Sequence, residues 1–319
     1  MAVLVGIDEA GFGPILGPLV VSSAVFSAPE NFYDQDLWHI LFRSVGKTRK
    51  HLAGRLLVCD SKKAYTRSIG TRHLNRTVMT LLLALNQKAE TVAQLLSILC
   101  PDCLSRLAQY PWYENVRDKA MPKIPADIRI AASAFKQDLA KADMKLLQLN
   151  SLCLDVWHYN NLVDKIRNKS SVLFHTVTIL IQQILDLSND EHIYITIDRH
   201  GGRTRYREHL QRSFPNMQLA IIAENSSSSS YQLTGQGKIV QLQFAVKADV
   251  NFLPVALASM ISKFVRELLM GSINQYFLEH AQQLKPTAGY WKDGLRFIKY
   301  VKQTLPHLAI DDKQLIRSR

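Results

Sequence analysis

The chain has 319 residues, 47% of them hydrophobic and 21% charged, which is the balance of a globular protein that can bury a sizeable core. The first residues lack the basic start of a secretory signal peptide, and no stretch approaches the roughly 18 uncharged apolar residues that span a bilayer. The four cysteines are too few for a disulfide scaffold at this length. These features predict a cytoplasmic, reducing location and no membrane partner.

The net charge of +12 is unevenly distributed along the chain. Residues 41–89 contain eleven basic side chains and a single acid, Asp60. The basic residues are Arg43, Lys47, Arg49, Lys50, Arg55, Lys62, Lys63, Arg67, Arg72, Arg76 and Lys88. Such a stripe suits the phosphate backbone of a nucleic acid, and a solvated cationic surface explains the charge equally well.

The first part of the chain combines short strands with helical segments. Residues 2–8 are apolar and β-branched, as in a buried strand, and residues 17–26 predict a second strand that runs antiparallel beside it. Residues 55–60 predict a short strand or a buried turn. Apolar residues then repeat at helical spacing over 71–99, and the proline-containing residues 110–127 predict an irregular connection.

The central part continues this alternation. Residues 127–147 predict a helix, and residues 148–159 predict a strand. A helix with a serine start is predicted over 170–187. Residues 192–198 and 217–224 predict two further buried strands.

The last part begins with five consecutive serines, residues 226–230, which predict a flexible loop. Residues 238–249 predict a strand, and a long apolar helix is predicted over 255–281. Strands and helices therefore interleave along the chain. The predicted fold class is α/β, with a mixed sheet flanked by helices.

Four acids share one setting in this pattern, because each follows an apolar strand and precedes a turn: Asp8, Glu9, Asp198 and Asp249. In open α/β sheets such strand ends meet at a ligand-binding crevice, where four carboxylates repel one another unless cations lie between them. Hard oxygen ligands suit Mg²⁺ or Mn²⁺, and two ions about 3.5–4 Å apart activate a water and stabilise the leaving oxygen of a phosphodiester. Capping of a turn or helix explains any one acid, but it does not explain the adjacent pair.

The glycine-rich turn that follows the pair is a second feature of this region. GFGPILG spaces its glycines as G-x-G-x-x-x-G rather than as the dinucleotide fingerprint G-x-G-x-x-G. Pro14 also removes a backbone amide that a phosphate would need. The turn is therefore not a dinucleotide loop, and its glycines let backbone approach a ligand closely.

Several motifs resemble the type 2 ribonucleases H. GIDEAGFGPILGPLVVSSAVF, residues 6–26, resembles the family's opening D-E-A-G-R-G-P-x-x-G-P, and CDSKKAY, residues 59–65, resembles its D-S-K-K segment. ITIDRHGG, residues 195–202, corresponds to the third acid at a strand end. KADVNFLPVALASMISKFVREL, residues 247–268, resembles the K-A/G-D stretch that leads into A-A-S-I-L-A-K-x-x-R-D, and GYWKDGLRFIKYV, residues 289–301, is a weaker echo of G-Y-x-T-K-x-H-L.

The resemblance implies a ribonuclease H-like fold that hydrolyses the RNA strand of RNA–DNA hybrids, or DNA duplexes containing ribonucleotides, with two Mg²⁺ or Mn²⁺ ions. The implied catalytic residues and metal ligands are Asp8, Glu9, Asp198 and Asp249. The implied substrate-binding residues are Gly11, Phe12, Gly13, Ser61, Lys62, Lys63, Ser259, Lys263 and Tyr290. The absence of a domain before the first strand and the position of the last acid indicate ribonuclease HII rather than HIII, and we expect a monomer.

The sequence departs from the family pattern in places. Phe12 replaces the arginine of G-R-G, and Val265–Glu267 replace T-R-D while keeping Arg266. Residues 70–143 predict a helical insertion, and residues 271–319 predict a C-terminal helical extension, both within a single catalytic domain spanning 1–319. These departures keep open an alternative: a divergent ribonuclease H-like protein that binds nucleic acid with weak or altered nuclease activity.

Two weaker signals lie outside these motifs. Cys100-Pro-Asp-Cys103 has the spacing of a zinc knuckle, but no second pair accompanies it, because Cys59 and Cys153 are distant in the sequence. The pair therefore predicts a helix end rather than a metal site. His200 follows Asp198 by two residues and predicts a solvated loop histidine rather than a proton shuttle.

Overall fold

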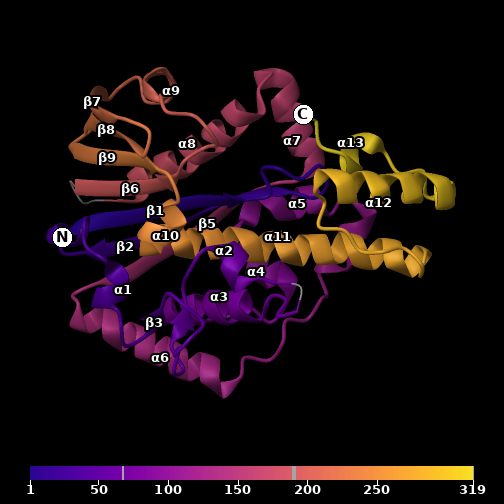
Figure 1. Ribbon diagram of the computed structural model, residues 1–319, viewed down its shortest axis with the longest axis horizontal. Helices are drawn as coiled ribbons and strands as arrows, with labels where there is room; N and C mark the ends of the chain where they lie inside the picture. Colours follow the sequence, from indigo (N-terminus) through magenta and orange to yellow (C-terminus); the bar gives the residue numbers. More distant parts are fainter. Residues whose placement is uncertain (67, 189–191, 319) are drawn as a thin grey trace.

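The computed structural model describes residues 1–66, 68–188 and 192–318, which form a seven-stranded mixed sheet with helices on both faces (Figure 1). The strand order is β5-β2-β1-β6-β9-β8-β7. The strands are β1 (Ala2–Ala10), β2 (Leu19–Ala28), β5 (Lys145–Leu154), β6 (His192–Asp198), β7 (Gln218–Glu224), β8 (Ser228–Gly235) and β9 (Lys238–Ala245), with a separate parallel pair β3 (Val45–Gly46) and β4 (Leu56–Leu57). The predicted fold class is confirmed.

The helices occupy both faces of the sheet and one end of it (Figure 1). The longer ones are α3 (Arg72–Ala84), α4 (Val92–Leu99), α6 (Ala126–Lys141), α7 (Val156–Ile166), α8 (Lys169–Leu187), α11 (Leu253–His280) and α12 (Trp291–Thr304). The shorter ones are η1 (Glu30–Phe32), α1 (Leu37–Ile40), α2 (Ser61–Ala64), η2 (Pro101–Cys103), α5 (Leu104–Leu107), η3 (Pro111–Val116), α9 (Arg207–Ser213), α10 (Ala248–Asn251), η4 (Pro306–Leu308) and α13 (Asp312–Leu315).

The centre of the sheet positions the predicted acids. β1 pairs antiparallel with β2, as predicted, and parallel with β6, which in turn pairs parallel with β9. The β1–β6 register places Ile7 beside Ile197, so Asp8 and Asp198 are the next residues on neighbouring parallel strands. Carboxyl ends of parallel strands open onto one edge of a sheet, and this edge carries the candidate site.

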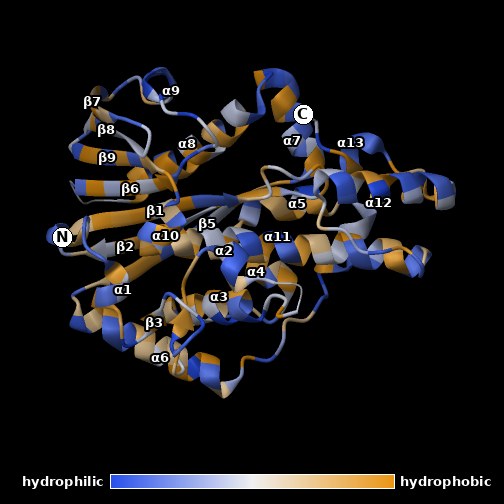
Figure 2. Cartoon of the chain, viewed as in Figure 1, coloured by the Kyte–Doolittle hydropathy of each residue, from blue (hydrophilic) through white to orange (hydrophobic). Residues whose placement is uncertain are grey.

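Two hydrophobic cores hold the layers together. One core joins a face of the sheet to α11 and the helices of residues 72–141, and the other joins the opposite face to α7 and α8. Figure 2 shows the apolar central strands between helices whose outward residues are polar. α11 lies very close to β1, since a Cβ on Gly6 would fall 2.0 Å from the backbone carbon of Pro254. This approach fixes α11 beside the end of β1.

α8 is more apolar than the sequence analysis allowed for. By length and composition alone it is able to cross a membrane, and 56% of its most apolar window is buried. Phe174 and Ile181 pack in the core beneath the sheet with Ile195 of β6. The helix therefore has the burial that a core helix of a globular protein shows.

The structure corrects several predicted boundaries. The helical spacing over 71–99 belongs to two helices, because Asn86 has a positive φ of 58° and Thr91 begins α4 with a capping box. The helix predicted over 127–147 ends at Lys141, and β5 already begins at Lys145. The strand predicted over 148–159 ends at Leu154, because the Asp155 side chain accepts from the backbone N–H of His158 at 3.0 Å and starts α7.

The predictions for residues 217–249 need larger corrections. The serine segment is not a loop throughout, since Ser228–Ser230 begin β8, where all three pair with β9 and Ser229 and Ser230 also pair with β7. β7 is an edge strand, which leaves Ile221 and Ile222 45% and 55% exposed instead of buried. β9 ends at Ala245, so Asp249 lies in the short helix α10 rather than at a strand end.

The predicted insertion contains α3–α6, which share a hydrophobic core with α11. α11 itself continues through residue 271 without a break. The boundaries of an insertion at 70–143 and an extension at 271–319 remain predictions.

Candidate active site

The four predicted acids lie on elements that meet at the carboxyl edge of β1, β6 and β9. Asp8 is 6% exposed, and its Oδ1 accepts from the backbone N–H of Glu9 at 2.7 Å. Oδ1 of Asp198 accepts from the backbone N–H of Ala248 at 2.9 Å. This bond fixes the start of α10 against the end of β6, and it thereby brings Asp249 beside Asp198.

Besides burial, the negative charges of the four acids raise one another's pKa values. Burial, and then the charges of Glu9 and Asp198, raise the pKa of Asp8 well above its usual value. Burial, and then Asp198, raise the pKa of Glu9 to about 7. Burial, and then Asp60 and Asp198, raise the pKa of Asp249 to about 6, and burial also raises the pKa of Asp198. The acids therefore form one cluster of repelling carboxylates.

The donor set of this cluster matches a hard divalent cation. Among residues 1–66, 68–188 and 192–318, no three or more His, Cys, Asp or Glu side chains are arranged to hold a metal ion. Mg²⁺ usually binds through one or two carboxylates and takes its other ligands from water and substrate phosphates. The acids provide such carboxylates, whose mutual repulsion is only partly offset by the nearby Lys62, and they do not form a closed protein cage.

These raised pKa values predict how the metal-free protein responds to pH. The folded-state pKa values of Glu9 and Asp249 lie above those of an unfolded chain, so their contribution to stability is complete below about pH 4 and is lost as the pH rises through 6 to 7. In EDTA, thermal unfolding should therefore occur at a lower temperature at pH 8 than at pH 5.5. Mg²⁺ or Mn²⁺ at pH 8 should raise Tm by on the order of 5 °C, whereas no response to either ion would argue against a metal site.

Ser61, Lys62 and Ser259 lie beside the acids. α2 begins after Asp60, whose Oδ1 accepts from the backbone N–H of Lys62 at 2.8 Å. The positive charge of Lys62 lowers the pKa of the acid cluster against the larger effect of burial. Ser259 donates to Ser61 Oγ at 3.0 Å, which connects α11 to α2. The structure thus brings these predicted residues together with the carboxylates.

Three other predicted residues have local partners, an exposed position or a charge that acts on the acids. Nζ of Lys263 lies 2.5 Å from Oε1 of Glu267 and 4.6 Å from the ring centroid of Tyr65. Tyr290 precedes α12 and is 52% exposed. Lys63 lies in α2 and lowers the pKa of Asp249 by its charge.

The glycine turn is shaped by contacts within the protein. Gly11 has a φ of +94°, and a Cβ there would fall 2.6 Å from the carbonyl oxygen of Pro18. Gly13, by contrast, faces open space. The ring of Phe12 packs against the core under α8, and Nζ of Lys169 lies 5.4 Å from its centroid. Gly11 is therefore required by the turn itself, and only Gly13 offers backbone without a steric neighbour.

Two buried arginines, which the sequence did not indicate as site residues, donate hydrogen bonds to backbone carbonyl oxygens of this turn. Arg266 donates to the carbonyl oxygens of Pro18 at 2.5 Å and of Leu16 at 3.1 Å. Arg317 donates to the carbonyl oxygen of Gly11 at 2.5 Å and to that of Pro14. Arg266 lies in the motif of residues 247–268. No local sequence pattern connects Arg317 with the turn, because 306 residues separate it from Gly11.

A chain of buried serine hydroxyls, here called the ladder, is hydrogen-bonded to the backbone of Asp8. Ser262 of α11 donates to the Asp8 carbonyl oxygen at 2.9 Å, its Oγ lies 2.7 Å from Ser22 Oγ, and Ser22 Oγ lies 2.8 Å from Ser151 Oγ. The ladder joins α11, β1, β2 and β5. In the sequence, these serines stand out only as polar residues within apolar segments. The predicted strands and helix gave them no role.

His200 contradicts its prediction. The side chain is 3% exposed and is surrounded by the rings of Phe174, Tyr206 and Phe244. Burial lowers its pKa to about 3, and neither ring nitrogen has a hydrogen-bond partner among the described residues. His200 is therefore a neutral core residue rather than a solvated one, and this state does not suit a proton shuttle.

The basic stripe is partly occupied by structural contacts. Arg55 donates to the carbonyl oxygens of Phe42 at 3.0 Å and His51 at 2.6 Å, and Arg76 donates to that of Gly54 at 2.7 Å. These guanidinium groups hold the loops around β3 and β4. The stripe is thus not a uniform phosphate-binding surface, and Arg67 lies outside the described residues.

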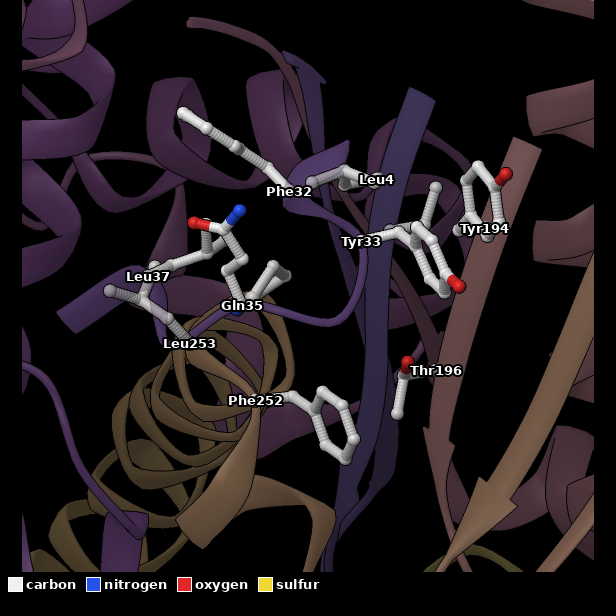
Figure 3. Close-up of a pocket in the computed structure, with 11 residues that line it drawn as sticks. Leu4, Phe32, Tyr33, Gln35, Leu37, Tyr194, Thr196, Phe252 and Leu253 are labelled. Atoms are coloured by element: carbon white, nitrogen blue, oxygen red, sulfur yellow. The ribbon is translucent and has the colours of Figure 1, made fainter. Parts of the chain in front are cut away.

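A small cavity of about 20 Å³ lies near the beginnings of β1 and β6 (Figure 3). Leu4 and Tyr194, which line it, precede Asp8 and Asp198 by four residues, or roughly 13 Å along an extended strand. The Tyr194 ring stacks on Tyr33 with centroids 4.5 Å apart. The cavity has room for about one water, and none of the four acids lines it.

Comparisons with known proteins give matches in structure alone. No known family model and no curated protein sequence matches the chain. RNase HII from Archaeoglobus fulgidus, in a complex with PCNA, is 15% identical with a TM-score of 0.40, and the match covers 99% of this chain and 94% of that one. Ribonuclease H2 from Pyrococcus horikoshii OT3 is 13% identical with a TM-score of 0.41, covering 98% and 92%. Bst-RNase HIII in complex with Mn²⁺ is 14% identical with a TM-score of 0.40, covering 99% and 66%.

All three matches are ribonucleases H of the kind that the motifs resemble.

Proposed function

We propose that this protein is a divalent-cation-dependent endonuclease that hydrolyses the RNA strand of RNA–DNA hybrids. The observation that carries the proposal is the cluster of Asp8, Glu9, Asp198 and Asp249, whose carboxylates raise one another's pKa at one edge of the sheet. A structural role alone gives a protein no benefit from four repelling carboxylates. A cation-dependent nuclease needs such a cluster.

The residues around the cluster suit the proposed substrate. Asp8, Glu9, Asp198 and Asp249 would hold Mg²⁺ or Mn²⁺, and the bound ions would activate water and stabilise charge on the leaving oxygen. Lys62 and Lys63 add positive charge beside the carboxylates, where a phosphate backbone would approach. Gly13 offers exposed backbone for a close contact with the sugar edge, which distinguishes RNA from DNA by its 2′-hydroxyl.

A second function has an observation in its favour. The described side chains contain no group of three or more potential ligands arranged to hold an ion, and Phe12 provides no cationic contact at the turn. Both features suit a nucleic-acid-binding protein with weak or altered nuclease activity.

One assay separates these functions. Labelled duplexes with one, four or all ribonucleotides in one strand are incubated with Mg²⁺ or Mn²⁺ and with EDTA. Cation-dependent internal cleavage of the RNA-containing strand supports the nuclease, and binding of the same duplexes without cleavage supports the alternative.

The same substrates test the role of Phe12. We expect the protein to cleave long RNA runs better than a single embedded ribonucleotide, because the ring forms no charge-assisted bond, which is worth about 1.5–3 kcal/mol. Phe12→Arg should then increase cleavage of the single-ribonucleotide duplex more than cleavage of the all-RNA strand. Equal effects on both substrates would indicate that backbone groups alone read the sugar and that Phe12 is neutral.

A further inference from the structure

Three cysteines that are dispersed in the sequence form one cluster in the fold. Cys100 ends α4, Cys103 ends η2, and Cys153 lies in β5. The Sγ atoms of Cys100 and Cys103 are 3.2 Å apart, and Cys103 also interacts with the Cys153 thiol. Cys153 is therefore a neighbour of Cys100 and Cys103 in the fold although it is distant from them in the sequence.

The three thiols differ in pKa, and Cys103 is the one whose pKa is lowered. Hydrogen bonding within the cluster lowers the pKa of Cys103 and raises the pKa values of Cys100 and Cys153, and either sulfur of the Cys100–Cys103 pair can be the donor. The Arg106 charge acts in the same direction on Cys103. Thiolates of this kind are the nucleophilic form of cysteine, whereas thiols buried in purely apolar surroundings are inert.

A cavity gives small molecules a place beside these sulfurs. It has a volume of about 280 Å³, and Cys100, Cys103, Cys153, Arg106 and His158 line it. Arg106 is fixed there, since its Nε lies 2.8 Å from Oδ2 of Asp155 and its Nη2 donates to the Cys153 carbonyl oxygen at 2.8 Å. The Arg106 guanidinium, paired with the Asp155 carboxylate, therefore lines the cavity next to the three sulfurs and provides a donor for the carboxylate of a small anionic disulfide.

We propose that Cys100 and Cys103 form a redox-active dithiol that closes to a disulfide by exchange with a small anionic disulfide such as oxidised glutathione. The Cys103 thiolate attacks one sulfur of the small disulfide and releases one thiolate, which leaves a mixed disulfide on Cys103. Cys100 then loses its proton, attacks the Cys103 sulfur and releases the second thiolate. The protein loses two electrons, and the small disulfide becomes two thiols.

The geometry suits this ring closure. A disulfide places its sulfurs about 2.05 Å apart, so the two Sγ atoms need to approach by only about 1 Å. Both cysteines lie at the ends of short helical segments rather than in the sheet, so the adjustment does not break a strand pairing. Cys153, which is held in β5, serves as a hydrogen-bond donor that stabilises the attacking thiolate.

The test uses the full-length protein without nucleic acid, so its outcome is independent of the proposed nuclease activity. Reduced protein is incubated with oxidised glutathione, quenched in acid, alkylated and analysed by mass spectrometry. We expect two of the four cysteines to become resistant to alkylation, with a Cys100–Cys103 disulfide in the peptide map. Iodoacetamide at pH 6 should modify Cys103 about tenfold faster than the matched buried thiol Cys59.

Substitutions assign the roles of the two sulfurs. Cys100→Ser should trap glutathione on Cys103, Cys103→Ser should abolish the reaction, and Cys59→Ser should leave it unchanged. The proposal would be overturned if glutathione were trapped on Cys100 instead, or if the cysteines reacted with oxidised glutathione only after the protein unfolds. A tightly bound Zn²⁺ that protects all three thiols would also overturn it. If a variant does not fold, the disulfide map and the iodoacetamide rates of the protein without substitutions still decide the question.

Discussion

Replacement of Asp8 by Asn is expected to reduce cleavage of an RNA–DNA hybrid by about 10³-fold, because it removes a charged ligand worth several kcal/mol in a cation-dependent reaction. The same change should stabilise the metal-free protein at pH 8. Burial and neighbouring acids raise the pKa of Asp8, so the ionised carboxylate is unfavourable there without a cation. An amide keeps the acceptor for the Glu9 N–H and carries no charge. The measurements are single-turnover cleavage, and thermal unfolding in EDTA.

The controls distinguish this effect from a general loss of structure. Asp34→Asn removes a charge from an exposed residue and should change neither cleavage nor Tm. Affinity of Asp8→Asn for an uncleaved hybrid should stay within a few-fold of the parent protein, because phosphate contacts supply most of the binding energy. Cleavage at a near-normal rate would show that Asp8 is not a catalytic ligand. An inactive variant with a lowered Tm in EDTA would show that the acid is structural.

Local sequence patterns placed Asp8, Glu9 and Asp198 at strand ends, because each of these signals lies within a few residues. β1 and β6 are apolar strands that end on Asp8–Glu9 and Asp198, and the parallel register of the two strands brings these residues together. Asp249 was assigned to a strand end, but Lys247 adopts a positive φ of 54° and turns the chain into α10 before Asp249 is reached. The residue still joins the cluster, since α10 docks on Asp198.

Long-range packing explains what the sequence could not predict. Ser22, Ser151 and Ser262 meet across β2, β5 and α11, and no local pattern identifies three serines as neighbours. Cys153 likewise reaches Cys100 and Cys103 only because β5 passes beside η2. Such contacts depend on which elements pack together, and that information is spread over the whole chain.

Arg317 is the clearest example, and its replacement is the second large effect that we expect. Arg317 is 4% exposed, and its guanidinium donates to the Gly11 and Pro14 carbonyl oxygens, while Ile316 forms a β-bridge with Leu16 on the same turn. Arg317→Ala leaves these carbonyl oxygens buried without their donor, which should cost roughly 2–4 kcal/mol in stability. The loosened turn directly follows Asp8 and Glu9, so kcat should also fall, by about tenfold or more.

The variants of Arg317 separate positioning from simple stability. Arg317→Lys keeps a donor and a positive charge, and it should recover part of both the Tm and kcat. Arg212→Ala removes an arginine that is 78% exposed and should change neither. If Arg317 positions the turn, the loss appears in kcat at temperatures where Arg317→Ala is fully folded, with KM for the hybrid changed less. A variant that keeps the parent kcat while folded would show that Arg317 only stabilises the protein, and that the geometry of the turn depends on Arg266 and on its own glycines.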